Sequence, residues 1–204
     1  MALTRIVLAS ASPRRLELLR SLGLVVEVRA SGYDEAAVPL PPAELASFHA
    51  AAKLRAAMQR GDSLAGPTIA ADTVVDLDGV ALGKPRDAAE ASAMLTSLSG
   101  REHLVHTAFA LAIPGAGTPT EERSTTRVRF YPLQREEIAT YVASGEPFDK
   151  AGAYGIQGFG ATIVERVDGD YFAVMGLPLA RLVTLLRDLG VRYRFVQLDV
   201  VASG

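Results

Sequence analysis

The chain of 204 residues suits one domain, or one domain drawn into two lobes. Hydrophobic residues make up 49% of it and charged residues 22%, which is typical of a soluble globular protein. The net charge of −2 disfavours a dedicated duplex-DNA or RNA binder. The absence of cysteine excludes a disulfide scaffold, a zinc–thiolate site and thiol catalysis, and it fits a reducing compartment.

The apolar runs are short. Ile6–Ala9 falls below the about 7–15 apolar residues of a signal peptide. The longest unbroken run, Ala108–Ile113, is far shorter than the ~18 residues of a membrane span. We therefore expect a cytoplasmic protein with no membrane partner, and a frayed tail over residues 200–204.

Strands and helices are predicted to alternate in the first half of the chain. Strands are expected at 5–9, 25–28, 68–76 and 80–82, and helices at 13–22, 43–60 and 88–98. Ser12 is the expected N-cap of the first helix, with Pro13 at its first position. Asp78-Gly79 is a hairpin signal between two of the strands.

In the second half, strands are expected at 103–113, 124–131, 163–167, 171–175 and 192–198, and helices at 134–144 and 178–189. A polar, glycine-rich segment covers 147–160, and Asp168-Gly169-Asp170 is interpreted as a second hairpin turn. Mixed helices and strands with two hairpins predict an α/β fold with a mixed sheet, as a single domain over 1–204.

The first candidate site is the sequence Ser10-Ala11-Ser12-Pro13-Arg14-Arg15, where a strand leads into a helix N-terminus. Free backbone N–H groups there favour an anion, and arginine adds a bidentate geometry for phosphate. The alternative is a capped helix that carries surface arginines.

The second candidate is Asp72, within the strand sequence Ala70-Ala71-Asp72-Thr73-Val74-Val75. An aspartate among small and β-branched residues is disfavoured unless it ends the strand or has a task. It could bind a divalent cation or act as a general base, or it could be a turn residue at the strand end. Turn chemistry accounts for Asp76 and Asp78.

Two lysines are ambiguous on residue type alone. Lys84 lies between Gly83 and Pro85, which constrains its backbone and suits a phosphate contact. Lys53 lies on the alanine-rich helix. Considered alone, each is better explained as an exposed surface lysine.

The glycine-rich segment from Phe148 to Gly158 contains Gln157, whose side chain can pair with an amide-like edge such as that of uracil or thymine. Its glycines let the backbone approach a ligand closely. The segment is not a dinucleotide fingerprint, because it does not follow a strand and open a helix, and the chain has no P-loop pattern.

Histidine does not point to a metal site. His103 and His106 are three residues apart in a predicted strand, so their side chains should point to opposite faces. His49, on the alanine-rich helix, is expected to be partly exposed.

Taken together, these segments resemble the Maf family of nucleotide pyrophosphatases from Ile6 to about Leu189. Blocks at family-like spacing occur in order: Leu8-Ala9-Ser10-x-Ser12-Pro13-Arg14-Arg15, Asp34-Glu35, Lys53, Ala71-Asp72-Thr73, Gly83-Lys84-Pro85, Leu98-Ser99-Gly100-Arg101-x-His103 and the block from Asp149 to Gly158. One departure is Phe48-His49-Ala50, where members often have Arg-Leu-Ala.

The resemblance implies hydrolysis of a nucleoside triphosphate to the monophosphate and pyrophosphate. It also implies a divalent metal (Mg, Mn or Co), an elongated two-lobed fold with a central cleft, and a possible homodimer. The block from Lys150 to Gly158 is similar to that of members acting on dTTP and UTP.

The resemblance further implies a role for individual residues. Asp72 would be the general base and, with Glu35, a metal ligand. The implied substrate-binding residues are Ser10, Arg14, Arg15, Lys53, Thr73, Lys84 and Gln157. Of these, Arg14, Thr73 and Gln157 would tune substrate choice.

Three other interpretations compete. One is the family branch acting on 7-methyl-GTP, which carries a different sequence around Gln157. Another is a non-catalytic nucleotide-binding protein acting in cell-division control. A single-strand nucleic-acid binder is disfavoured by 6% aromatic residues, the absence of Trp and the negative net charge, so no stable nucleic-acid partner is expected.

Overall fold

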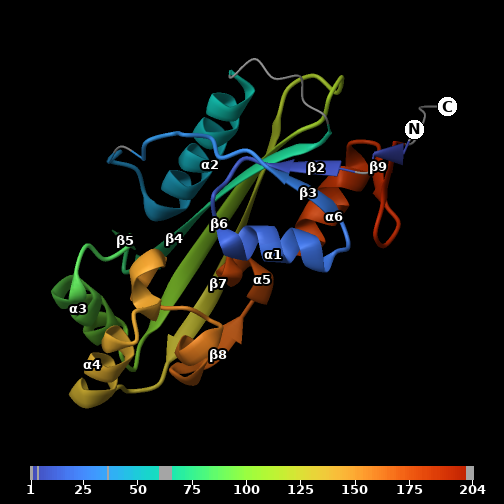
Figure 1. Cartoon of the computed structure of the whole chain (residues 1–204). Helices are drawn as coiled ribbons and strands as arrows, with labels where there is room; N and C mark the ends of the chain where they lie inside the picture. The colour runs from blue at the N-terminus through green and yellow to red at the C-terminus, as the bar shows by residue number, and fades with distance from the viewer. Residues whose placement is uncertain (1, 4, 36, 60–65, 201–204) are drawn as a thin grey trace.

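The computed structural model describes residues 2–3, 5–35, 37–59 and 66–200, and Figure 1 shows an elongated molecule built on long central strands. A seven-stranded mixed sheet has the order β3-β2-β4-β6-β7-β8, with β5 paired to β4. β2 is parallel to β3 and β4, and the other pairs are antiparallel. Its strands are β2 (Arg5–Leu8), β3 (Val25–Val28), β4 (Thr68–Leu77), β5 (Val80–Leu82), β6 (Glu102–Ala112), β7 (Thr120–Phe130) and β8 (Val164–Asp168). The predicted mixed α/β fold is confirmed.

Helices cover both faces of the sheet at the upper end in Figure 1. α2 (Pro42–Met58) packs on the face of β4 and β6 that carries alanines, among them Ala70, Ala108 and Ala110. The opposite face carries larger residues such as Phe109 and packs against α1 (Pro13–Ser21) and α6 (Leu179–Asp188). Side chains alternate between the two faces of a strand, so one strand serves two different layers.

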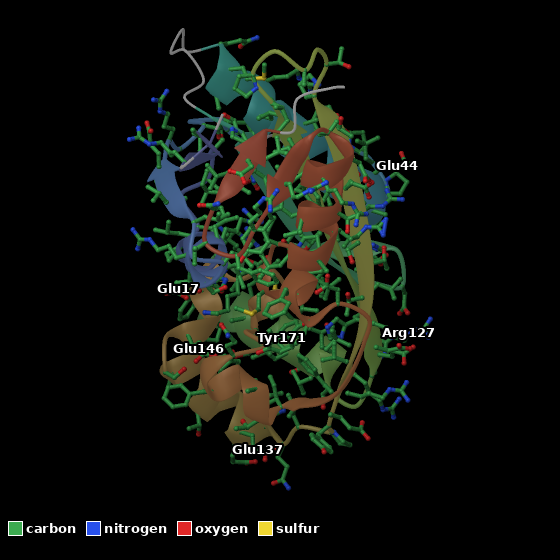
Figure 2. All side chains as sticks on the ribbon, turned by 90° about the vertical axis from the view of Figure 1, so that its right-hand side faces the viewer. Glu17, Glu44, Arg127, Glu137, Glu146 and Tyr171 are labelled. Carbon is green, nitrogen blue, oxygen red and sulfur yellow. The ribbon has the colours of Figure 1, made fainter. Side chains whose placement is uncertain are left out.

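A second core fills the lower end of the molecule. There the far half of β4 packs with α3 (Ala88–Leu98) and α4 (Arg135–Ala143), which lie together at the lower left in Figure 1. Since β4, β6 and β7 run through both ends, the chain forms two lobes on one shared sheet. β7 alternates between exposed and buried positions, and Figure 2 shows Arg127 pointing outwards from it.

One predicted hairpin is wrong. Residues 171–175 form a helix, α5 (Tyr171–Met175), not a strand returning beside β8. The cause is Asp170, whose Oδ1 accepts the backbone N–H groups of Phe172 at 2.8 Å and Ala173 at 3.1 Å. An aspartate that caps these donors starts a helix, although Tyr-Phe-Ala-Val-Met has the composition of a strand.

The C-terminal prediction of one strand over 192–198 is also wrong. The chain forms β9 (Val191–Tyr193) and β10 (Leu198–Val200), paired antiparallel, and β10 pairs with β1 (Ala2–Leu3). Phe195 and Val196, at φ of 45° and 74°, form the turn between them. Of the expected frayed tail, Val200 is part of β10, and residues 201–204 lie outside the described residues, as does residue 60 of the expected helix 43–60.

Over the described ranges, no helix combines the length and the apolar character that a bilayer crossing requires.

Removing the cap of α5 should weaken the fold. We expect Asp170→Ala to lower the free energy of unfolding by about 1 kcal/mol, because two backbone donors lose their acceptor. Urea denaturation measures this change. Asp168→Ala removes the same charge from an exposed residue two positions earlier and should have little effect. Equal losses in the two variants would show that Asp170 does not act as a cap.

Candidate active site

A cavity of about 360 Å³ lies where the two lobes meet. Its walls come from α1, α2, β4, the segment after β5, and the glycine-rich segment between α4 and β8. This cavity corresponds to the expected central cleft. Its lining carries five cations, Arg14, Arg15, Lys53, Lys84 and Lys150, and three carboxylates, Glu35, Asp72 and Asp149.

A buried lysine joins two of these carboxylates. The Lys53 Nζ lies 2.6 Å from Asp72 Oδ1 and 2.5 Å from Glu35 Oε1. Asp72 lies on β4 between Ala70 and Val74, on the face that α2 covers, so the alternation of the strand brings it to Lys53. Burial disfavours ionisation of Glu35, but the hydrogen bond and charge of Lys53 outweigh it, so the pKa of Glu35 lies below its ordinary value. Glu35 is therefore ionised at neutral pH.

A second cation, Arg15, is buried and fixed by three acceptors. Its Nε donates to the Gly176 carbonyl at 2.9 Å, and its two terminal nitrogens donate to Ser10 Oγ at 3.3 Å and Thr73 Oγ1 at 3.2 Å. Burial lowers the pKa of Arg15, although a guanidinium stays charged at any ordinary pH.

The same contacts place two further expected site residues. Thr73 lies on the face of β4 opposite to Asp72, where α1 packs, and it lines the cavity beside Arg15. The Thr107 hydroxyl donates its proton to the Ala173 carbonyl and accepts the hydroxyl proton of Thr73 at 2.9 Å, which holds Thr73 in place. Ser10 is buried behind Arg15 and does not belong to the cavity lining, so in this structure its expected contribution passes through Arg15.

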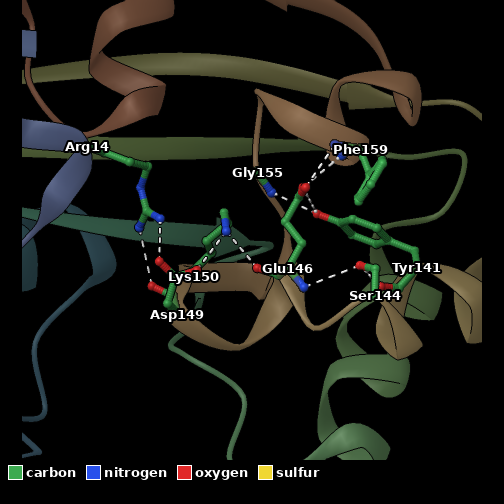
Figure 3. A network of polar contacts seen from close by, with 9 residues as sticks. Arg14, Tyr141, Ser144, Glu146, Asp149, Lys150, Gly155 and Phe159 are labelled. Atoms are coloured by element: carbon green, nitrogen blue, oxygen red, sulfur yellow. Dashed lines mark hydrogen bonds and ion pairs between the residues drawn. The ribbon is translucent and has the colours of Figure 1, made fainter. Parts of the chain in front are cut away.

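The third cation, Arg14, reaches across the cavity to the other lobe. Its terminal nitrogens donate to Asp149 Oδ2 at 2.6 Å and to the Asp149 carbonyl at 3.3 Å (Figure 3). Lys150 Nζ donates to the other oxygen of Asp149 at 2.7 Å. Burial opposes ionisation of Asp149, but these two cations hold its pKa below the ordinary value.

Lys84 and Gln157 are exposed residues of the cavity wall. The charge of Lys84 contributes to the low pKa of Glu35, which places it within electrostatic reach of that carboxylate. The structure therefore brings Arg14, Arg15, Glu35, Lys53, Asp72, Thr73, Lys84 and Gln157 to one cavity.

Sequence reasoning missed several contributors. Asp149 stood in the glycine-rich block but was not singled out as a partner of Arg14. His49 is buried rather than partly exposed, lines the cavity, and lies 3.3 Å from the Tyr33 hydroxyl through Nδ1. The signal for His49 was its spacing of four residues from Lys53, which puts both on one face of α2.

The two strand histidines have separate partners. His103 is buried, with Nε2 2.8 Å from the Tyr154 hydroxyl, and its ring packs edge-on against Phe130. His106 contacts Asp76 and Thr125. Tyr154 belongs to the cavity wall, so His103 supports the wall from behind.

An α/β fold whose cavity gathers this many cations around a pair of carboxylates defines a binding site for a densely charged anion such as a polyphosphate. Comparison with known sequences is more specific. The family described as "Maf-like protein" matches residues 5–189, and the chain belongs to this family.

Curated relatives cover nearly the whole chain. A dTTP/UTP pyrophosphatase of Thermus thermophilus is 49% identical over 188 residues, covering 92% of this chain and 96% of the relative. A dTTP/UTP pyrophosphatase of Methylobacillus flagellatus is 50% identical, covering 93% of this chain and 94% of the relative. A solved structure from Mycobacterium abscessus, described as a nucleoside-triphosphatase and dITP/XTP pyrophosphatase, aligns with a TM-score of 0.43 at 19% identity over 91% of this chain and 97% of that one.

The burial of His103 predicts a pH dependence of stability. Burial lowers the pKa of His103 to about 4, whereas an unfolded histidine titrates near about 6.5. Between these values the unfolded state binds the additional proton, so the free energy of unfolding should fall as the pH drops from about 6.5 to about 4, by up to about 1.4 kcal/mol per unit.

His103→Gln keeps a polar partner for Tyr154 and should flatten this dependence. Urea denaturation of both proteins across that pH range gives the comparison. Parallel curves for the two proteins would show that His103 titrates normally in the folded chain.

Proposed function

We propose that this chain hydrolyses dTTP and UTP to the nucleoside monophosphate and pyrophosphate, by attack of water at the α-phosphorus. The observation that carries the proposal is the cavity in which Lys53 joins Asp72 and Glu35 beside two arginines. The similarity to the dTTP/UTP pyrophosphatases of Thermus thermophilus and Methylobacillus flagellatus supports the reaction and the substrates.

The triphosphate is held by the cations of the wall. Arg15 presents a guanidinium whose orientation is fixed by Ser10, Thr73 and Gly176, which suits bidentate binding of phosphate oxygens. Arg14 and Lys84 add charge from the two sides of the cavity. Since Arg14 is paired with Asp149, a phosphate group bound there competes with that carboxylate.

Asp72 is the general base. Lys53 engages its Oδ1 at 2.6 Å, which fixes the plane of the carboxylate. Oδ2 takes part in no hydrogen bond among the described residues, so we assign to it the proton of the attacking water. Lys53 also limits repulsion between this carboxylate, Glu35 and the incoming phosphates.

The residues present fit a divalent metal only as part of its ligand set. Within the described ranges no three His, Cys, Asp or Glu side chains form a complete metal site. Glu35 and Asp72 both contact Lys53, so their carboxylate oxygens lie close together and could serve as metal ligands. Mg²⁺ is commonly held by one or two carboxylates together with substrate phosphates and water. Glu35 and Asp72 would hold Mg²⁺, Mn²⁺ or Co²⁺, and the bound ion would neutralise phosphate oxygens.

Gln157 reads the base. Its exposed amide lies on the cavity wall, and an amide can donate to and accept from the edge of uracil or thymine. Thr73 influences this choice by fixing Arg15. A cytoplasmic location, expected from the short apolar runs, and a homodimer, implied by the family resemblance, stay predictions.

Removal of the Asp72 carboxylate should stop catalysis. We expect Asp72→Asn to lower kcat on dTTP and UTP by about 10²–10⁴, the usual contribution of a positioned acid or base. Pyrophosphate release with Mg²⁺ or Mn²⁺ measures the rate, and a thermal unfolding curve verifies the fold.

The matched control is Asp78→Asn, the same change at an exposed turn residue with φ of 55°, a conformation that asparagine tolerates. It should retain normal turnover. Near-normal turnover of folded Asp72→Asn would refute the assignment of the base. No pyrophosphate from any nucleotide, with folded wild-type protein and metal supplied, would favour a non-catalytic nucleotide-binding protein.

Truncation of Gln157 should weaken base selection. We expect Gln157→Ala to reduce the preference for dTTP over dATP by about tenfold, because the pyrimidine edge loses its polar partner. The ratio of kcat/KM values on the two substrates measures it. Gln197→Ala, at an exposed position of the C-terminal hairpin, is the control. Equal losses on both bases would mean that Gln157 does not read the base.

A further inference from the structure

We propose that Tyr141 and Glu146, which do not line the cavity, are positioning residues that hold Gln157 in the orientation needed to read the base. This inference rests on the proposed function, because it concerns the same base-reading segment. Both residues lie behind the segment 155–160, in and directly after α4 (Figure 3).

The carboxylate of Glu146 accepts three hydrogen bonds. Its Oε2 accepts the backbone N–H of Phe159 at 2.8 Å, and its Oε1 accepts that of Gly160 at 2.9 Å together with the Tyr141 hydroxyl, also at 2.9 Å. The Tyr141 oxygen in turn accepts the N–H of Gly155 at 3.1 Å. The pair therefore fixes the backbone on both sides of Gln157.

Two glycines, Gly158 and Gly160, are needed for this packing. A Cβ on Gly158, where φ is 69°, would lie 2.4 Å from Glu146 Oε2. A Cβ on Gly160 would lie 2.6 Å from the Tyr141 hydroxyl and 2.1 Å from the Gly155 carbonyl. Gly158 and Gly160 thus allow close approach to the chain's own carboxylate and phenol.

The protonation states of Glu146 and Tyr141 favour the same hydrogen bonds. Although burial opposes it, the pKa of Glu146 lies below its ordinary value, because backbone N–H groups and Tyr141 hydrogen-bond to the anion. Burial raises the pKa of Tyr141, so its hydroxyl keeps the proton that it donates. An ionised acceptor and a protonated donor give the stronger, charge-assisted form of hydrogen bond.

A further contact ties Glu146 to the substrate side of the cavity. Lys150 Nζ donates to the Glu146 carbonyl at 2.6 Å and to Asp149, the partner of Arg14. One short segment thus carries the base reader at one end and a contact to a phosphate-binding arginine at the other. This arrangement couples the position of the base to that of the triphosphate.

Glu146→Gln is the sharpest test, because it keeps the shape of the side chain. Each oxygen of Glu146 faces a backbone N–H, so the amide NH₂ of glutamine must oppose an N–H whichever way it is turned. Tyr141→Phe removes the link to Gly155. We expect either change to reduce the ratio of affinities for α,β-methylene dTTP over α,β-methylene dATP by about tenfold, with the affinity for the dATP analogue kept within about twofold.

The combined variant should lose little more of the affinity ratio than either single variant, since the two residues act as one unit. Amide hydrogen exchange over 155–160 should become faster in each. Glu137→Gln is the matched control: it makes the same change on α4, at a carboxylate that accepts only the N–H of Gln134 and lies lower on the lobe in Figure 2. It should leave affinities and exchange as in the wild type.

Calorimetric titration gives the affinities, and pyrophosphate release by the wild type tests the proposed function separately. Equal weakening for both analogues, or faster exchange with unchanged selectivity, would overturn the positioning role. Selective binding without pyrophosphate release would defeat the proposed reaction and leave the affinity ratios to decide this inference. A wild type that binds both analogues equally would overturn the inference.

Discussion

The site depends on one buried contact, the ammonium of Lys53 between the carboxylates of Asp72 and Glu35. Without this cation, the two carboxylates would repel each other and the incoming phosphates in a partly buried cavity, where such repulsion is stronger than in water. The contact requires α2 to lie close to β4. Small alanine side chains, such as Ala50 on the helix and Ala108 on the sheet, allow this close packing. The alanines of the interface therefore determine whether Lys53 can reach Asp72.

The alternation of β4 distributes the remaining tasks. Adjacent residues of a strand point to opposite faces, so Asp72 meets α2 while Thr73 meets Arg15 of α1. In the proposed reaction, this dipeptide places the general base, Asp72, in one layer and the support of the phosphate-binding Arg15 in the other. The same strand passes between the two cores, and the cavity opens where it leaves one and enters the next.

Elements governed by local rules could be predicted from the sequence. Hydrophobic periodicity located β2, β3, β4 and α3. The strand predicted over 171–175 was wrong because a short apolar run does not show a period that separates helix from strand. The helix depends on the side chain of Asp170 accepting backbone N–H groups, and residue type alone does not show that orientation. The contact of Arg14 with Asp149, 135 positions away, could not be predicted at all, because only the tertiary fold brings the lobes together.

The glycine-rich block shows why residue type alone left the base-reading segment open. Glycine permits close approach by any group. Only the packing shows that Glu146 and Tyr141 are the groups that approach here. A flexible segment would lose conformational freedom each time Gln157 engaged a base, which costs affinity and blurs discrimination. A segment already held at Gly155 and Gly160 loses little on binding. If Gln157 reads the base as proposed, selectivity for a pyrimidine depends on Tyr141 and Glu146, which do not line the cavity, and the rigidity of this segment has to be encoded beside the residue that reads the base.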